Sequence, residues 1–157
     1  MKALKWAALA AVAAAVGIQV LPGGRRTNPP VTGEIQAPPE VLSILRRSCY
    51  DCHSNETRWP WYARVAPVSW LIARDVGGAR FKMNFSTWAA IPEPYPMLYR
   101  HEIVKNVEAG TMPLPRYLWL HPDARLSAAD RDLLRRWAGT PAGTGSGAEG
   151  PDPTPSN

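Results

Sequence analysis

Residues 49–53 read Cys49-Tyr50-Asp51-Cys52-His53, and this stretch decides how the rest of the sequence is interpreted. Cys-x-x-Cys-His is the pattern of a c-type haem attachment site. Two cysteines three residues apart lie on the same side of a helical turn, so that both sulfurs can reach the two vinyl groups of one haem. His53 then offers an imidazole nitrogen to the iron as proximal ligand. The motif predicts one covalent haem c per chain, bound by Cys49, Cys52 and His53.

The residues before the motif are arranged to support this geometry. Leu42, Leu45, Cys49 and Cys52 follow one another at steps of three and four residues, which places them on one face of a helix. Pro38-Pro39 suit the first turn of such a helix. The sequence therefore predicts an amphipathic helix that begins near Pro38-Pro39 and carries the haem at its end.

Three other uses of paired cysteines were weighed. A thioredoxin-like redox pair needs a βαβ context, and no alternating strand pattern precedes the motif. A zinc site needs a second pair of ligands at finger-like spacing, but there is no other cysteine, and His101 and His121 lie far along the chain. A disulfide between cysteines three apart would close a very small strained loop. Covalent haem is the interpretation that the sequence favours.

Composition indicates a small all-α protein. The 157 residues carry 18 Lys+Arg against 13 Asp+Glu, a formal net charge of +5, and the arginines are scattered. Nucleic-acid binding usually shows a basic stripe, which is missing, so we expect no nucleic-acid partner. An acidic redox partner or anionic lipid suits this charge better, although much of it is a solvated surface. Seventeen prolines and seven tryptophans predict short helices, rigid connections and an aromatic interior.

Residues 1–22 have the pattern of an export segment. Lys2 and Lys5 precede an Ala-rich apolar run from Trp6 to Leu21, and no small-x-small cleavage site follows it directly. This favours an uncleaved anchor over a removed signal peptide. Either form predicts a periplasmic location, on the inner membrane if the anchor stays and free if the leader is cleaved. Arg25-Arg26 lie on the side expected to be translocated, which opposes this topology.

We divide the remainder into a Pro-rich linker over 23–37, a haem-binding domain over 38–139 and a disordered tail over 140–157. Within the domain, periodicity predicts a helix over 65–76 closed by Gly77-Gly78, a short helix over 84–90 and a helix over 96–109 ending at Gly110. The last helix begins at Ser127, which forms a near capping box with Asp130, and stops at Gly139. Residues 117–126 are expected to be an irregular connector.

The sixth iron ligand is predicted to be Met112. It lies in Thr111-Met112-Pro113-Leu114-Pro115, where the prolines exclude a helix and hold the thioether in a stiff loop. His121 is the alternative ligand, and an open site is the third. Met83, Met97 and His101 carry no specific signal.

Several stretches are similar to a known family. The order of helices, the Cys49–His53 motif, the Met112-Pro113 loop and a closing helix with Trp137 resembles class I cytochrome c. More closely, the chain resembles the bacterial haem-binding domain family of exported proteins. The resemblance rests on these stretches: Arg26-Thr27-Asn28-Pro29-Pro30, Cys49 through Thr57, Trp59-Pro60-Trp61-Tyr62, Ala66-Pro67-Val68-Ser69-Trp70 and His121-Pro122-Asp123-Ala124. It implies a single haem c in an extracytoplasmic domain, and no particular reaction. The Trp-Pro-Trp-Tyr insert departs from ordinary small cytochromes c.

Two functions follow from these features. One haem, a plausible methionine ligand and the absence of a second cofactor motif favour a non-enzymatic electron carrier between membrane-associated and soluble redox partners. The alternative is a haem-based sensor or small peroxidase with an open or displaceable sixth site, in which Arg58, Arg64 or His101 would line a distal pocket. A structural subunit of a larger oxidase is a third, weaker interpretation.

Overall fold

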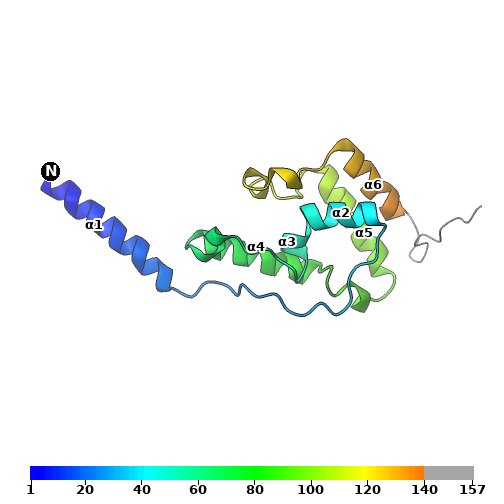
Figure 1. The fold of residues 1–157 in the computed structure, drawn as a ribbon, viewed down its shortest axis with the longest axis horizontal. Helices are drawn as coiled ribbons and strands as arrows, with labels where there is room; N and C mark the ends of the chain where they lie inside the picture. The colour runs from blue at the N-terminus through cyan, green and yellow to red at the C-terminus, as the bar shows by residue number, and fades with distance from the viewer. Residues whose placement is uncertain (140–157) are drawn as a thin grey trace, which may run out of the picture. The chain divides into compact units, whose positions relative to one another are not determined.

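The computed structural model describes residues 1–139, and over that range the chain is helical (Figure 1). No strand forms between residues 1 and 139; the single β-type contact is an isolated parallel bridge between Gly33 and Thr87. The all-α prediction is confirmed. The predicted tail, 140–157, lies outside the described residues. The α-helices are α1 (Lys2–Gly17), α2 (Pro39–Ser48), α3 (Tyr50–His53), α4 (Val68–Lys82), α5 (Tyr95–Glu108) and α6 (Ala128–Gly139). Short 3-10 turns are η1 (Ile18–Val20), η2 (Trp61–Arg64), η3 (Trp88–Ala90), η4 (Tyr117–Trp119) and η5 (Pro122–Ala124).

These elements group into two compact units, each formed by two stretches of the chain. The first unit combines residues 1–33 with 50–87, and the second combines residues 34–49 with residues from 88 onward. The boundary between the units passes between Cys49 and Tyr50, inside the motif. The linker and domain boundaries that the sequence suggests stay a prediction.

In the first unit, α3 and η2 pack on α4. Phe85 is fully buried beneath α3, where its ring stacks on Tyr50 with centroids 5.3 Å apart. The Phe85 N–H donates to the His53 carbonyl at 2.7 Å, so the end of α3 is fixed to the segment that follows α4. Apolar burial and one backbone hydrogen bond thus hold a four-residue helix that would not be stable alone.

In the second unit, α6 packs against both α2 and α5. Leu45 of α2 and Leu134 of α6 are fully buried, as burial of apolar faces at helical spacing requires. The Arg100 guanidinium of α5 lies 4.9 Å from the centroid of the Trp137 ring in α6, in a cation–π contact. Trp137 is therefore part of this core, as its place in the sequence predicts.

Two glycine signals turn out differently. Gly110 follows the end of α5 with φ +67°, the left-handed conformation that closes many helices, and this predicted stop is confirmed. The prediction that Gly77-Gly78 close the preceding helix is wrong, because α4 continues through them to Lys82. Neither Gly77 nor Gly78 has a positive φ. The helical hydrogen bonds continue to the one in which the Met83 N–H donates to the Ala79 carbonyl at 2.9 Å. A glycine ends a helix only where the backbone leaves the right-handed region.

Other boundaries also shift. The short helix expected over 84–90 is reduced to the single 3-10 turn η3, and α4 begins three residues later than periodicity suggests. The connector over 117–126 contains the two turns η4 and η5.

The start of α6 is the predicted capping box. The Ser127 hydroxyl accepts from the Asp130 N–H at 3.1 Å, and the Asp130 carboxylate accepts from the Ser127 N–H at 2.8 Å. Arg47 of α2 also donates to this carboxylate at 2.8 Å. Burial raises the pKa of Asp130, but the hydrogen bonds from Ser127 and the charge of Arg47 outweigh it and hold the pKa below its ordinary 3.8.

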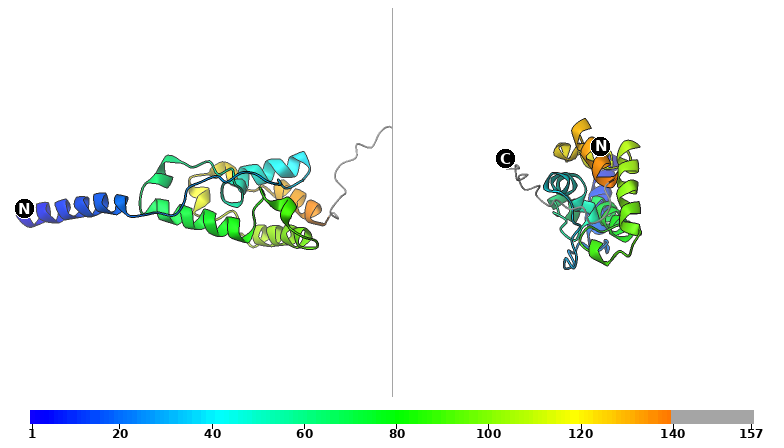
Figure 2. Two further views of the ribbon diagram at one scale, coloured as in Figure 1. Left: turned by 90° about the horizontal axis from the view of Figure 1, so that it is seen from below. Right: turned by 90° about the vertical axis from the view of Figure 1, so that its right-hand side faces the viewer.

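The apolar helix α1 with η1 spans Lys2–Val20, 19 residues of mean hydropathy 1.7, and none of its residues is buried (Figures 1 and 2). This length and composition suffice to cross a membrane and are also those of a signal sequence.

We expect Asp130→Asn to lower the free energy of unfolding by about 1 kcal/mol at neutral pH, because the cap and the Arg47 pair both weaken. A depressed folded pKa stabilises the fold only above the unfolded pKa, so the difference from wild type should shrink as pH falls through the folded pKa. Urea unfolding followed by helical circular dichroism measures both. The matched control is Asp132→Asn on the same helix, an exposed carboxylate paired with Arg135. An equal loss in both variants, independent of pH, would contradict this account.

Candidate functional site

The motif is not one continuous helix. Helix α2 ends at Ser48, and Cys49 leaves the helical region with φ −127° and ψ −33°, although its N–H still donates to the Leu45 carbonyl at 2.8 Å. Tyr50–His53 then form the separate turn α3. The predicted single face carrying both cysteines is thus broken at Cys49. Both thiols are half-buried and are not joined in a disulfide.

The His53 ring is fixed by the backbone. Its Nδ1 lies 3.1 Å from the Met83 carbonyl oxygen. A carbonyl only accepts, so Nδ1 carries the proton and Nε2 holds the lone pair. Burial lowers the pKa of His53, opposed by hydrogen bonds to the Met83 and Ala79 carbonyls and aided by the charge of Lys82. The lowered pKa favours the neutral imidazole at pH 7, with its proton on the nitrogen that donates to the Met83 carbonyl.

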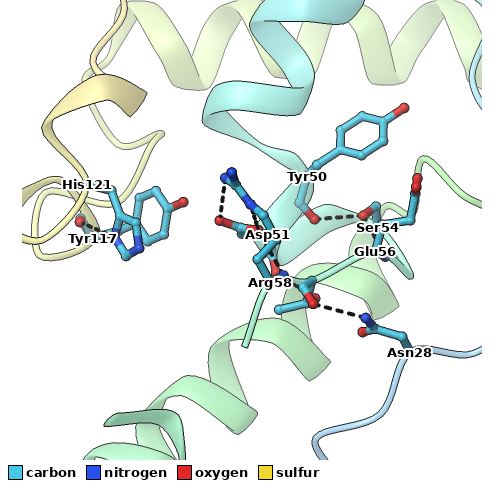
Figure 3. A network of polar contacts seen from close by, with 9 residues as sticks. Asn28, Tyr50, Asp51, Ser54, Glu56, Arg58, Tyr117 and His121 are labelled. Atoms are coloured by element: carbon cyan, nitrogen blue, oxygen red, sulfur yellow. Dashed lines mark hydrogen bonds and ion pairs between the residues drawn. The ribbon is translucent and has the colours of Figure 1, made fainter. Parts of the chain in front are cut away.

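Asp51 closes the loop that follows the motif (Figure 3). Its buried carboxylate accepts from the Arg58 N–H, Nε and Nη2, each at 3.1 Å. The Thr57 hydroxyl donates to the Asp51 carbonyl at 2.8 Å, and the Ser54 hydroxyl donates to the Tyr50 carbonyl at 2.8 Å. Residues 50–58 thus form a loop closed by its own side chains, and Arg58 is part of that closure.

Arg80, on α4, is the centre of a second set of contacts. Its guanidinium donates to the Ser54 and Thr27 carbonyls, both at 2.7 Å, and to the side-chain oxygens of Asn28 and Thr57, at 3.0 and 2.8 Å. The planar fork of arginine is suited to several fixed acceptors at once. This side chain ties the loop after His53 to residues 27–28 and to α4.

The side-chain amides of Asn28 and Asn55 add further hydrogen bonds to the loop after His53 and the residues near it. Asn28 donates to the Thr57 carbonyl at 2.9 Å and accepts from the Trp59 indole at 3.1 Å. Asn55 donates to the Pro30 carbonyl at 2.9 Å and accepts from Asn84 at 2.8 Å. The Asn-Pro-Pro stretch is thereby bonded to the loop that follows the motif, where the sequence indicated only an extended spacer.

Met112 is half-buried in a braced loop of the second unit. The N–H groups of Thr111 and Met112 both donate to the Asn106 carbonyl, at 3.0 and 3.2 Å, and the Thr111 hydroxyl donates to the same carbonyl at 3.0 Å. Asn106 in turn donates to the Glu102 carbonyl one turn earlier at 2.7 Å. The loop is thus fixed to the end of α5 by hydrogen bonds to Asn106, and its role as a ligand loop stays a prediction.

The remaining candidates are placed as follows. The His121 ring stacks on Tyr117 with centroids 3.9 Å apart, and its Nδ1 lies 3.0 Å from the Tyr117 carbonyl (Figure 3). His101, Arg64 and Met97 are exposed. Met83 contributes its carbonyl, not its sulfur, to His53.

Arg80, Asn28 and Asn55 are the framework residues that motif reasoning did not identify. No group of three or more His, Cys, Asp or Glu side chains suited to a metal ion occurs in residues 1–139. The signal in the sequence for Asn28 is the stretch Arg26-Thr27-Asn28-Pro29-Pro30, whose pattern carries the family resemblance but indicates no contact.

We expect Arg80→Ala to lower the free energy of unfolding by about 2 kcal/mol, because it leaves two carbonyls and two side-chain oxygens without their charged donor. Arg80→Lys should recover part of this loss, since an ammonium donates to some of the four acceptors. Lys82→Ala, an exposed cation two residues on, serves as control and should change stability little. Urea denaturation of the three variants decides the matter; equal stability of Arg80→Ala and wild type would show that the contacts around Arg80 do not hold the loop.

A family model described as "Haem-binding domain" matches residues 13–140, which is most of the chain. No curated protein and no solved structure gives a match. The match includes the motif, the Asn-Pro-Pro stretch and the Met112 loop. The chain belongs to the haem-binding domain family, and it binds haem.

Proposed function

We propose that the protein is an exported, membrane-anchored monohaem c-type cytochrome that carries single electrons between redox partners. The observation that best supports this proposal is the hydrogen bond from His53 Nδ1 to the Met83 carbonyl. It belongs to a motif whose two cysteine thiols form no disulfide. The donor set fits a covalent haem c: two sulfurs at the attachment spacing and a neutral imidazole oriented through its second nitrogen. Haem supplies reversible one-electron iron chemistry when bound.

The chain's own residues have three tasks in this proposal. Cys49 and Cys52 would hold the cofactor covalently through their two sulfurs. The Met83 carbonyl keeps the His53 ring in one tautomer and one orientation. Arg80 and Asn55 hold the loop that begins directly after His53, which limits rearrangement when the charge at the site changes.

Met112 is proposed as the sixth ligand. The support is its loop: three hydrogen bonds to the Asn106 carbonyl fix the backbone on either side of Gly110, so that a thioether can be held for a weak bond. A thioether ligand together with a histidine would raise the reduction potential and leave no open coordination position, which would suit a carrier. A sensor or peroxidase with Arg58 as a distal residue is less supported, because Arg58 is bonded to Asp51.

Export and anchoring are proposed from α1. A helix of this apolarity with no buried residue has no protein core to enter, and a bilayer would cover it. The redox partners are proposed to be membrane-associated proteins, because an anchored carrier meets partners at the same surface.

We expect the protein, matured in cells that attach haem c after export, to keep its haem in denaturing gel electrophoresis and to stain for peroxidase activity. Cys49→Ser with Cys52→Ser should abolish the stained band, since no thiol remains for attachment, while each single variant retains one linkage. Ser48→Ala is a control adjacent to the motif. A wild-type band that is colourless under the same conditions would contradict covalent attachment.

We further expect the iron to cycle reversibly between its two oxidation states without binding carbon monoxide in the reduced form. Met112→Ala should remove the weak red-end absorption of the oxidised protein, lower the potential and admit carbon monoxide, because a coordination position opens. Met97→Ala, an exposed methionine, should leave spectrum and potential unchanged, and His121→Ala tests the alternative ligand. Wild-type protein that binds carbon monoxide tightly and does not cycle reversibly would favour the sensor or peroxidase interpretation instead.

A further inference from the structure

The Trp-Pro-Trp-Tyr stretch separates two tryptophans with opposite environments. Trp59 is half-buried, donates to Asn28 and lies beneath the Arg80 guanidinium at 6.0 Å. Trp61, two residues on, is 78% exposed in η2. Val65, in extended backbone at the end of η2, and Val68 and Leu71, one turn apart at the start of α4, are also exposed. We call these four residues the η2 patch. Neither the haem site nor the core of the first unit uses it.

The η2 patch lies next to the end of the apolar helix. The Ala66 N–H donates to the Gln19 side-chain oxygen at 2.9 Å, and the Gln19 amide donates back to the Ala66 carbonyl at 3.2 Å. Gln19 belongs to η1, the last turn of the apolar segment, and Ala66 directly follows Val65. Figures 1 and 2 both show the end of α1 beside the η2 end of α4, within the first unit. A reciprocal pair of hydrogen bonds thus fixes the patch at the level where the apolar segment ends.

Gly23 and Gly24, which follow the apolar segment, lie close against α4. A Cβ on Gly24 would lie 2.6 Å from the Ala73 Cβ, and a Cβ on Gly23 would lie 3.0 Å from the Trp70 ring. The Gly24 position leaves no room for a Cβ without a shift, and at Gly23 the Trp70 ring would have to give way by a few tenths of an ångström. The chain that leaves the apolar helix therefore runs against α4, and does not separate the helix from the first unit as a free spacer would.

We propose that the η2 patch enters the interface of the same lipid bilayer that α1 crosses, so that the first unit rests on the membrane through Trp61, Val65, Val68 and Leu71. The inference rests on the proposed anchoring by α1. Tryptophan is enriched at the level of the lipid headgroups, where its ring meets the acyl chains and its N–H meets water. Arg25 follows the apolar segment along the chain, and Arg64 lies two residues before Ala66, the residue that Gln19 contacts. Both arginines are exposed and suit anionic headgroups. A bilayer is favoured over a protein partner because α1 brings it to the patch.

The chain offers a matched reference position. Phe81 is 92% exposed and apolar like Trp61, but it lies at the other end of α4, about 20 Å from Val68 at the rise of an α-helix. If exposure of an apolar ring alone caused lipid contact, both positions would show it. If position relative to α1 causes it, only Trp61 will.

The test uses the full haem-loaded chain in vesicles of phosphatidylethanolamine and phosphatidylglycerol, with the photoreactive residue benzoylphenylalanine in place of Leu9, Trp61 or Phe81, one per variant. Lipid adducts are measured by mass spectrometry after irradiation. We expect adducts at positions 9 and 61, and several-fold less at 81. Adding Gln19→Ala should reduce the adduct at 61 and leave that at 9 unchanged, whereas Gln36→Ala, an exposed control, should change neither.

The outcomes separate this inference from the proposed anchoring. Adducts at 9 with no excess at 61 over 81 would overturn the membrane contact and leave the anchor intact. No adduct at 9 would overturn the anchor, and with it the reason for placing the patch in a bilayer. Cross-links from position 61 to a second protein chain in place of lipid would show that the patch is a protein-docking surface, which also overturns the proposal.

Discussion

The hydrogen bond from His53 Nδ1 to the Met83 carbonyl is the constraint on which the site depends. It places the ring proton on Nδ1 and comes from the residue that follows α4, so the orientation of the ring depends on where that helix ends. Burial lowers the pKa of His53 and favours the neutral imidazole, the form that the proposed ligation of iron would need. A shorter α4, ending at Gly77-Gly78, would not place this carbonyl as the acceptor. The length of one helix and the chemistry of one side chain are therefore connected.

Around this bond the first unit uses polar contacts where a larger protein would use apolar core. Few large apolar side chains are buried there besides Tyr50 and Phe85. Arg80, Asn28 and Asn55 instead satisfy carbonyls of the Pro-rich stretch and of the loop after the motif. Prolines donate no N–H, so segments rich in them leave carbonyls that need outside donors. The many prolines therefore explain why Arg80, Asn28 and Asn55 are needed as donors to these carbonyls.

The segment between the apolar helix and residue 30 is held at both of its ends. Residues 27–30 are hydrogen-bonded to Arg80 and to the loop after His53. At the other end, Gln19 bonds to Ala66, and Gly23 and Gly24 pack against α4. In the proposed function, the anchor and the cofactor loop are thereby parts of one unit, and the segment between them does not act as a free tether. An electron carrier gains from this arrangement because the orientation of its cofactor relative to membrane-bound partners is restricted.

The sequence by itself determined the all-α class, the apolar N-terminal helix, the stop at Gly110 and the capping box at Ser127, because each depends on residues within one or two turns of one another. Tertiary structure alone decided the break at Cys49, the passage of α4 through Gly77-Gly78, and the partners of Arg80 and Asn55. Those features depend on side chains separated by tens of residues, for which a linear pattern carries no distance information. The hydrogen bond between His53 and Met83 spans 30 positions, and only the folded chain brings its two ends together.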